Sequence, residues 1–305
     1  MEPKKVIHFL YVPWTGLGMY GGFRGNRWLR NRIKVFKQFV IPSLLAQTSK
    51  NFVLWCSWRF EERNNPHVKE LMKYLDQIPE FKTVHTFAGV CFWDDKYPDA
   101  EARSRLLSSL HNSLVDLLEI TAGYDEVLMT IQPSDDCYRK DMVAGVQSLL
   151  QNPQLDAVGF TKGYMANYRT LEIHEYNPTT NPPFFTIKFP RDIFIDPLKH
   201  AEYTGPYKSH EYVGDKLRYG KIEERGFLVG THGENISTVF NHPFKGAWVT
   251  SDTWEQFGLN LVDPLKINIS IRKWLLRKLP HRVQRKLRYW FGEKIYNRFY
   301  NWIRS

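Results

Sequence analysis

The chain has 305 residues, of which 43% are hydrophobic and 24% are charged, a composition typical of a globular protein with a full core. The net charge of +10 gathers at one end. Residues 266–305 carry 12 Lys and Arg against one acid, so the rest of the chain holds 30 basic and 31 acidic side chains. A near-neutral body excludes a nucleic-acid footprint spread over the folded domain, because such a footprint needs a basic face.

The sequence also argues against several other classes of protein. Cys56, Cys91 and Cys137 are too few and too far apart for a disulfide scaffold or a zinc site, and we expect reduced thiols in a cytosolic protein. The N-terminus lacks the apolar core of a signal peptide. No stretch reaches the roughly 18 consecutive apolar residues of a membrane-spanning helix.

The first half alternates short apolar segments with amphipathic ones. We expect strands at residues 5–12, 51–58, 81–87 and 124–131. We expect helices at residues 29–45, 66–76 and 100–120. Such alternation predicts an α/β fold, in which a mostly parallel central sheet is flanked by helices on both faces.

The second half changes character. A helix at residues 141–150 is followed by strand-like segments among Pro, Asn and Gly, at residues 157–160, 170–176 and 184–189. Neither a linker nor a repeat separates the halves, so we expect one continuous domain. From Ile267 onwards, apolar residues recur at helical spacing among Lys and Arg, which predicts a basic amphipathic tail hinged at Pro280.

The segment Thr130–Tyr138, TIQPSDDCY, places Asp135 and Asp136 side by side where the fourth strand ends. Ligands of open α/β sheets bind outside the carboxyl ends of the strands. Two adjacent carboxylates repel each other, so either a cation stands against them or they are solvated. One of them capping the following helix is a further interpretation.

The order of these segments resembles the opening of A-type glycosyltransferases. The resemblance rests on a strand, an Arg-rich helix running into Phe39–Gln47 (FVIPSLLAQ), and a second strand with Phe52 and Trp55. It covers roughly residues 5–245 and is greatest for bacterial sequences grouped as rhamnosyltransferases. It implies a nucleotide-sugar-dependent transferase whose Asp-x-Asp motif aligns with Pro133-Ser134-Asp135, so that proline stands where the first aspartate is expected.

The resemblance also implies a divalent metal, Mn²⁺ or Mg²⁺, that neutralises the diphosphate leaving group. The metal ligands implied are Asp135, Asp136 and His232, with His242 as a rival. Each histidine is alternatively an ordinary loop residue bonded to backbone. As a ligand of the metal that bridges the diphosphate, Asp135 would also belong to the donor-binding residues.

The remaining candidates follow from the chemistry of transfer. A base must take the proton of the acceptor hydroxyl, and Glu211 and Asp215 are the candidates, although an exposed helix start explains them equally well. Arginines suit diphosphate oxygens, so Arg24, Arg32 and Arg103 are candidate donor-binding residues, or else solvated surface charges.

Taken with the resemblance, these expectations give a glycosyltransferase domain at residues 1–250 and a tail at 251–305. The domain has a nucleotide-sugar-binding half at 1–150 and an acceptor half at 151–250. We expect transfer to a glycan or lipid-linked acceptor in bacterial surface polysaccharide synthesis (capsule or lipopolysaccharide). The tail, through residues 266–305, would bind the anionic inner face of the cell membrane. Packing of the tail on the body, or RNA binding, are the alternatives for the tail. A non-catalytic membrane-associated scaffold is the alternative for the whole chain.

Overall fold

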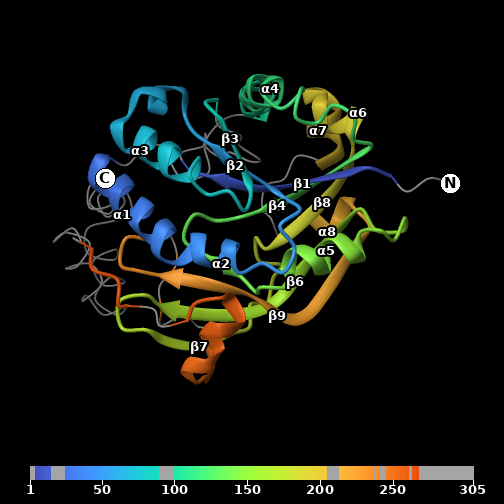
Figure 1. Cartoon of the computed structure of the whole chain (residues 1–305). Coiled ribbons are helices and arrows are strands. Elements are labelled where there is room, and N and C mark those ends of the chain that lie inside the picture. Colours follow the sequence, from blue (N-terminus) through green and yellow to red (C-terminus); the bar gives the residue numbers. More distant parts are fainter. Residues whose placement is uncertain are drawn as a thin grey trace, which may run out of the picture.

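The computed structural model describes residues 4–14, 25–88, 99–204, 213–235, 238, 240, 245–260 and 263–267. In these ranges, a ten-stranded mixed sheet forms the centre of the molecule, with helices on both sides of it (Figure 1). The α/β architecture expected from the alternating segments is thereby confirmed.

Four parallel strands make up one part of the sheet, and they are the four that the sequence predicts. They lie in the order β3-β2-β1-β4. Their bounds are Val6–Pro13 for β1, Val53–Ser57 for β2, Lys82–Thr86 for β3 and Glu126–Ile131 for β4. In β1, Phe9 and Tyr11 enter one core cluster while Leu10 and Val12 enter the other. Strands buried on both faces read as continuous apolar runs, which is why this one was recognisable.

The helices divide between the two faces of the sheet. One core cluster draws on α1 (Asn26–Val35), α2 (Ile41–Leu45), α3 (Pro66–Leu75) and α5 (Met142–Leu149). The other draws on α4 (Asp99–Val115), α6 (Arg191–Ile195), α7 (Pro197–Thr204) and α8 (Val213–Lys216). A short 3-10 helix, η2 (Phe60–Asn64), precedes α3. Buried apolar side chains from both sets hold the sheet between two helical layers.

The helical run expected at residues 29–45 starts three residues earlier and contains a wider turn. Between α1 and α2 lies a π-helical segment, η1 (Phe36–Val40), in which the Ile41 N–H donates to the Phe36 carbonyl. Pro42 has no N–H and its ring crowds the carbonyl four residues before it. A π turn just before the proline accommodates both constraints without ending the helix.

The second half of the sheet is largely antiparallel. It contains β5 (Cys137–Tyr138), β6 (Ala157–Asn167), β7 (Glu172–Tyr176), β8 (Phe185–Pro190), β9 (Tyr219–Thr231) and β10 (Lys245–Trp248). Strand β8 joins the halves because it lies antiparallel between β4 and β6. The strand expected at residues 157–160 extends to Asn167, and its full length pairs with β9 in parallel. The long β9 strand carries the chain back to the edge where β4 ends.

The chain continues to pack on the body past residue 250. A 3-10 helix, η4 (Ser251–Phe257), buries Trp254 and Phe257, and Leu265 is 3% exposed. On the outer side of the α1–η1 run, Lys34 Nζ donates to the Lys266 carbonyl at 2.7 Å. Gln38 Nε2 donates to the Asp263 carbonyl at 2.7 Å. The rest of the predicted tail, residues 268–305, lies outside the described residues.

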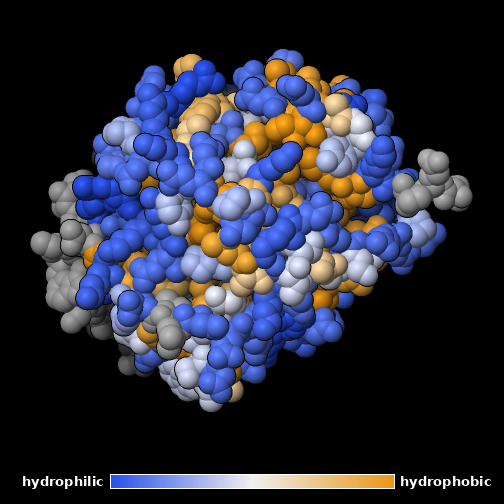
Figure 2. Space-filling view, viewed as in Figure 1, coloured by the Kyte–Doolittle hydropathy of each residue, from blue (hydrophilic) through white to orange (hydrophobic). Residues whose placement is uncertain are grey.

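The surface is uneven in polarity. Hydrophilic residues cover α1 and α3, whereas apolar residues gather over α4 and α7 (Figure 2). Val115 at the end of α4, Leu118 just after it and Leu198 in α7 are exposed large apolar residues. Among the described residues, no helix combines the length and the apolar character needed to cross a membrane.

Candidate functional site

The acidic pair lies at the edge of the sheet where the parallel strands end. The register aligns Tyr11 of β1 with Ile131 of β4, so the chain leaves both strands at one level. Gln132, 1% exposed, closes the turn that follows β4: its amide nitrogen donates to the carbonyls of Pro133 at 3.0 Å and Asp136 at 2.9 Å. The turn therefore holds Asp135 and Asp136 at the carboxyl edge, as expected.

Strand β9 brings a second segment to this turn. Cys137 in β5 pairs with Leu228 in β9, which places the residues after β9 beside the acidic pair. The Gly230 N–H donates to Asp136 Oδ1 at 2.8 Å. A Cβ at Gly230 would lie 2.2 Å from the Asp135 carbonyl oxygen, so only glycine permits this approach.

Asp135 is the centre of a network of donors. Its Oδ2 atom contacts Arg32 Nη1, Asn235 Nδ2 at 3.1 Å and His232 Nε2 at 3.2 Å. Its backbone carbonyl accepts the Tyr168 hydroxyl at 3.0 Å. Three segments separated by about a hundred residues thus converge on one carboxylate.

Arg32 reaches Asp135 from the buried face of α1. Its side chain is only 5% exposed, and its guanidinium lies 5.3 Å from the centre of the Trp28 ring, one helical turn earlier. Asp135 is 13% exposed. A largely buried charge needs a counter-charge, and the two side chains supply this to each other.

The two neighbouring carboxyl groups have different pKa values, so they do not both carry a charge. Burial alone would raise the pKa of Asp135, but the Arg32 guanidinium and the His232 hydrogen bond outweigh it and lower the pKa to about 2. Burial and the charge of Asp135 raise the pKa of Asp136 well above its ordinary value. Asp135 is therefore the charged member of the pair, and Arg32 is the cation that stands against it.

His232 is held in one orientation by the loop that follows β9. The Glu234 N–H donates to His232 Nδ1 at 3.3 Å, so the ring proton lies on Nε2 and faces Asp135. Asn235 Oδ1 accepts the His232 backbone N–H at 2.8 Å. Glu234 is fully buried, and its carboxylate pairs with Arg27 of α1 at 2.7 Å.

The structure thus brings together four of the predicted residues: Arg32, Asp135, Asp136 and His232. Asp215 is exposed on α8, where it stays a prediction. Arg103 lies in α4, but its side chain is not described. The other predicted residues, Arg24, Glu211 and the rival His242, lie outside the described residues.

The arrangement does not fit a divalent metal. Across the described ranges, no group of three or more His, Cys, Asp or Glu side chains is placed to hold one. One of the two Asp135 carboxylate oxygens, Oδ2, already faces three nitrogen atoms.

Sequence reasoning missed the residues that complete the network. Glu234 and Asn235 lie within two and three positions of His232, and this clustering of polar residues after an apolar strand was a usable signal. Arg27 and Tyr168 gave none, because their contacts depend on pairing between distant segments. Glycine is required at position 230 because folding brings the Asp135 carbonyl oxygen to 2.2 Å from where a Cβ would lie.

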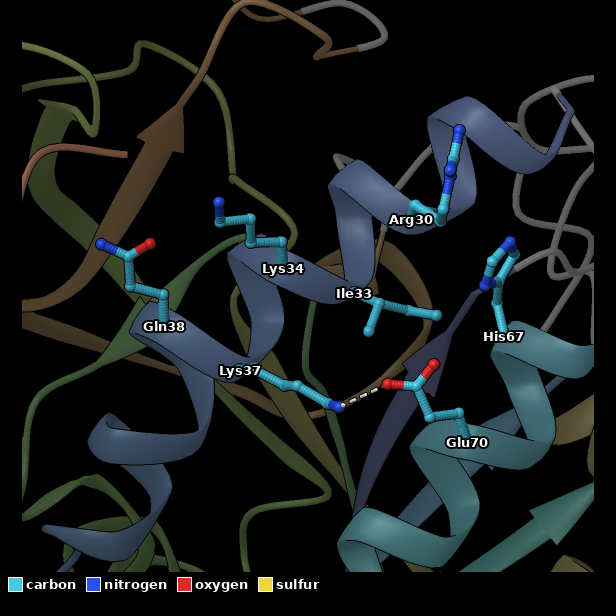
Figure 3. A pocket seen from close by; sticks show the side chains of 7 residues that line it. All are labelled: Arg30, Ile33, Lys34, Lys37, Gln38, His67 and Glu70. Atoms are coloured by element: carbon cyan, nitrogen blue, oxygen red, sulfur yellow. Dashed lines mark ion pairs between the residues drawn. The ribbon is translucent and has the colours of Figure 1, made fainter. Parts of the chain in front are cut away.

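A separate hollow lies on the outer side of α1. It has a volume of about 470 Å³ and is lined by residues of α1, η1 and α3: Arg30, Ile33, Lys34, Lys37, Gln38, His67 and Glu70 (Figure 3). Lys37 and Glu70 form an ion pair of 3.6 Å across it. Arg30 and Arg32 therefore belong to opposite faces of one helix.

Comparisons with known proteins give distant likenesses only. No protein-family model matches the sequence, and no curated protein matches it. Staphylococcus aureus TarS residues 1–349 in complex with UDP-GlcNAc is 11% identical with a TM-score of 0.40, over 74% of this chain and 58% of that one. The same TarS fragment without these ligands gives 14% identity and a TM-score of 0.39, over 92% and 85%.

A 4-diphosphocytidyl-2C-methyl-D-erythritol synthase gives 10% identity and a TM-score of 0.34, over 72% of this chain and 90% of that one. In the comparison with the UDP-GlcNAc complex, this chain spans 58% of the TarS fragment, which is less than two thirds of its length. All three TM-scores are below 0.5, so the argument for function rests on the site itself.

Proposed function

We propose that this chain is a glycosyltransferase that moves a sugar from a nucleotide-sugar to a glycan or lipid-linked acceptor. The observation that carries the proposal is the convergence of Arg32, Asp135 and His232 at the carboxyl edge of four parallel strands. Ligands of α/β sheets bind at this edge. The acidic turn that belongs to the resemblance with A-type glycosyltransferases lies at this same edge, after β4.

The chemistry of transfer explains why cations belong here. As the acceptor oxygen attacks the anomeric carbon, the bond from that carbon to the diphosphate breaks and negative charge builds up on the diphosphate. A guanidinium at this edge stabilises that charge more in the transition state than in the ground state. The acceptor proton must pass to a base, for which Asp215 and Glu211 remain the candidates.

Donor binding and turnover test the proposal directly. The purified full-length protein is titrated with UDP, GDP, CDP and TDP, and the nucleotide that raises its melting temperature identifies the base. Nucleotide-sugars of that base are then incubated with the protein, and release of the nucleoside diphosphate is measured by chromatography. Stabilisation by one nucleotide together with its release supports the proposal. No stabilisation by any of them would refute it.

The non-catalytic scaffold remains the second candidate because Pro133 stands where the resemblance places the first aspartate. A scaffold that kept a donor site would bind a nucleotide-sugar without releasing the nucleoside diphosphate. The two measurements above separate these candidates, since binding without turnover in the presence of acceptor extracts favours the scaffold.

We further propose that the chain acts on the inner face of a bacterial cell membrane, in surface polysaccharide synthesis. The support is the charge of residues 266–305, with 12 basic residues against one acid among recurrent Trp, Phe and Leu. Full-length protein should sediment with phosphatidylglycerol vesicles and much less with phosphatidylcholine vesicles. Equal binding to both would contradict an electrostatic attachment.

A further inference from the structure

The carboxylate of Asp135 is engaged by hydrogen-bond donors rather than left open for a metal. Arg32, His232 and Asn235 all direct nitrogen atoms at Oδ2. A divalent metal binds through an oxygen lone pair, and here Oδ2 is engaged by hydrogen bonds from His232 and Asn235 and by the ion pair with Arg32 Nη1. A metal at this oxygen would have to displace the strongest of the three, the guanidinium.

Displacing Arg32 from Asp135 is unfavourable for two reasons. The side chain is 5% exposed against Trp28, so it would keep its charge in a buried place without its counter-ion. A dication bound in its stead would add two further positive charges next to it. Arg32 and a divalent metal therefore exclude each other at this oxygen.

Arg32 also has capacity for another ligand. Its Nε and Nη1 atoms are buried and neither makes a hydrogen bond among the described residues, although Nη1 forms the ion pair with Asp135. A guanidinium offers five N–H donors in a planar fork that matches phosphate oxygens. Asp135 contacts it at Nη1 and leaves the remaining donors to other acceptors.

We propose that Arg32 takes the place of the divalent metal in this site, so that the chain binds the diphosphate of its donor without one. This inference rests on the proposed function for the identity of the ligand. In this arrangement Asp135 is a positioning residue that holds the guanidinium at the edge of the sheet, with His232 and Asn235 fixing the carboxylate. The proline at the first motif position is then consistent with the loss of a metal ligand.

The first test measures metal directly. Mn²⁺ is titrated into the wild-type protein and its free concentration is followed by electron paramagnetic resonance. We expect no binding with a dissociation constant below about 1 mM. Binding in the micromolar range that Asp135→Asn abolishes would overturn the proposal. This measurement needs no nucleotide, so it stands even where the proposed donor is wrong.

The second test measures nucleotide affinity by calorimetry, using the nucleoside diphosphate that stabilises the protein. Affinities in EDTA and in Mn²⁺ should agree within about twofold, and loss of binding in EDTA would overturn the proposal. Arg32→Gln should lower the affinity at least tenfold, with Arg32→Lys intermediate because it keeps the charge but not the planar fork.

The matched control is Arg30→Gln, which removes the same charge from the opposite, exposed face of α1 (Figure 3). It should leave the affinity unchanged, and an equal loss in both variants would refute a specific role for Arg32. If Arg32→Gln does not fold, the comparison of EDTA with Mn²⁺ on the wild type still decides. Failure of every nucleoside diphosphate to bind refutes the proposed function, while the Mn²⁺ titration continues to test the exclusion of metal.

Discussion

Gly230→Ala tests the packing that brings β9 to the acidic turn. A Cβ at this position would lie 2.2 Å from the Asp135 carbonyl oxygen and 2.3 Å from the nearest atom of the Tyr168 ring. Neither neighbour can yield easily. The first is backbone, and the Tyr168 ring is fully buried and stacked on Phe39 with ring centres 3.7 Å apart. The strand must therefore move away from the turn.

The expected cost follows from two effects. Forcing an extra methyl group into a packed core costs about 1–3 kcal/mol. Moving the strand also stretches the bond from the Gly230 N–H to Asp136 Oδ1, now 2.8 Å, and a hydrogen bond to this neutral carboxyl group contributes about 0.5–1.5 kcal/mol. Together they predict a loss of about 1.5–4.5 kcal/mol in the free energy of unfolding.

The assay is denaturation in urea followed by circular dichroism. The matched control is Gly145→Ala in α5, where an added Cβ meets nothing within 4 Å. There alanine should leave stability unchanged or raise it by up to about 1 kcal/mol, because glycine disfavours helix interiors. A loss below about 1 kcal/mol for Gly230→Ala would show that the turn and β9 do not pack as described.

Three further predictions concern buried polar groups. Asp135→Asn should lower the free energy of unfolding in urea by about 3–5 kcal/mol because it leaves Arg32 buried without a counter-charge. The control is Asp141→Asn, which breaks the exposed ion pair with Arg139 and should lower it by less than about 1 kcal/mol. Equal losses in the two variants would contradict the prediction. Burial lowers the pKa of His200 from its ordinary 6.5 to about 4, so the folded state keeps it neutral while the unfolded state binds a proton. Stability from this group is complete above about pH 6.5 and falls by up to about 3 kcal/mol as the pH drops to 4. His200→Asn, whose amide can still donate to the Phe194 carbonyl, should flatten the acid side of the stability curve, and an unchanged slope would contradict the assignment. Burial also raises the pKa values of Cys56 and Cys137 to about 12, so iodoacetamide at pH 8 should label each of them only after denaturation, as mass spectrometry would show. Labelling of either one in the native protein would contradict its burial.

Strands β1, β2 and β4 were predictable from the sequence because each is buried on both faces, whereas β3 at the edge of the sheet is only partly buried. An uninterrupted apolar run such as β4 needs no knowledge of its partners to be recognised. The first half of β9 is not recognisable from the sequence, since Lys221, Glu223 and Glu224 lie exposed along it and interrupt the apolar pattern. A local pattern of apolar residues indicates a buried strand, and that pattern disappears where the strand extends out of the core.

Four members of the site were predictable, namely Arg32, Asp135, Asp136 and His232, but their contacts were not. Asp135, Asp136 and His232 were recognisable because each follows an apolar segment. That Arg32 meets Asp135 depends on the pairing of β1 with β4 and on the packing of α1, which no local pattern records. The proposed absence of a metal follows from that contact, so the sequence could indicate only that one ligand position was missing.

The helix that holds Arg32 is also tied to the end of the described chain. Its buried face presents the guanidinium to Asp135, while on its outer face Lys34 and, in the following π turn, Gln38 bind the carbonyls of Lys266 and Asp263. These two hydrogen bonds hold the backbone of Asp263 and Lys266 against the α1–η1 run. A pull on the chain beyond Ile267 is therefore transmitted to α1 first, and through one rigid helix to the position of the guanidinium. The backbone carbonyls of Asp263 and Lys266 and the guanidinium of Arg32 are thus connected across the diameter of a single helix.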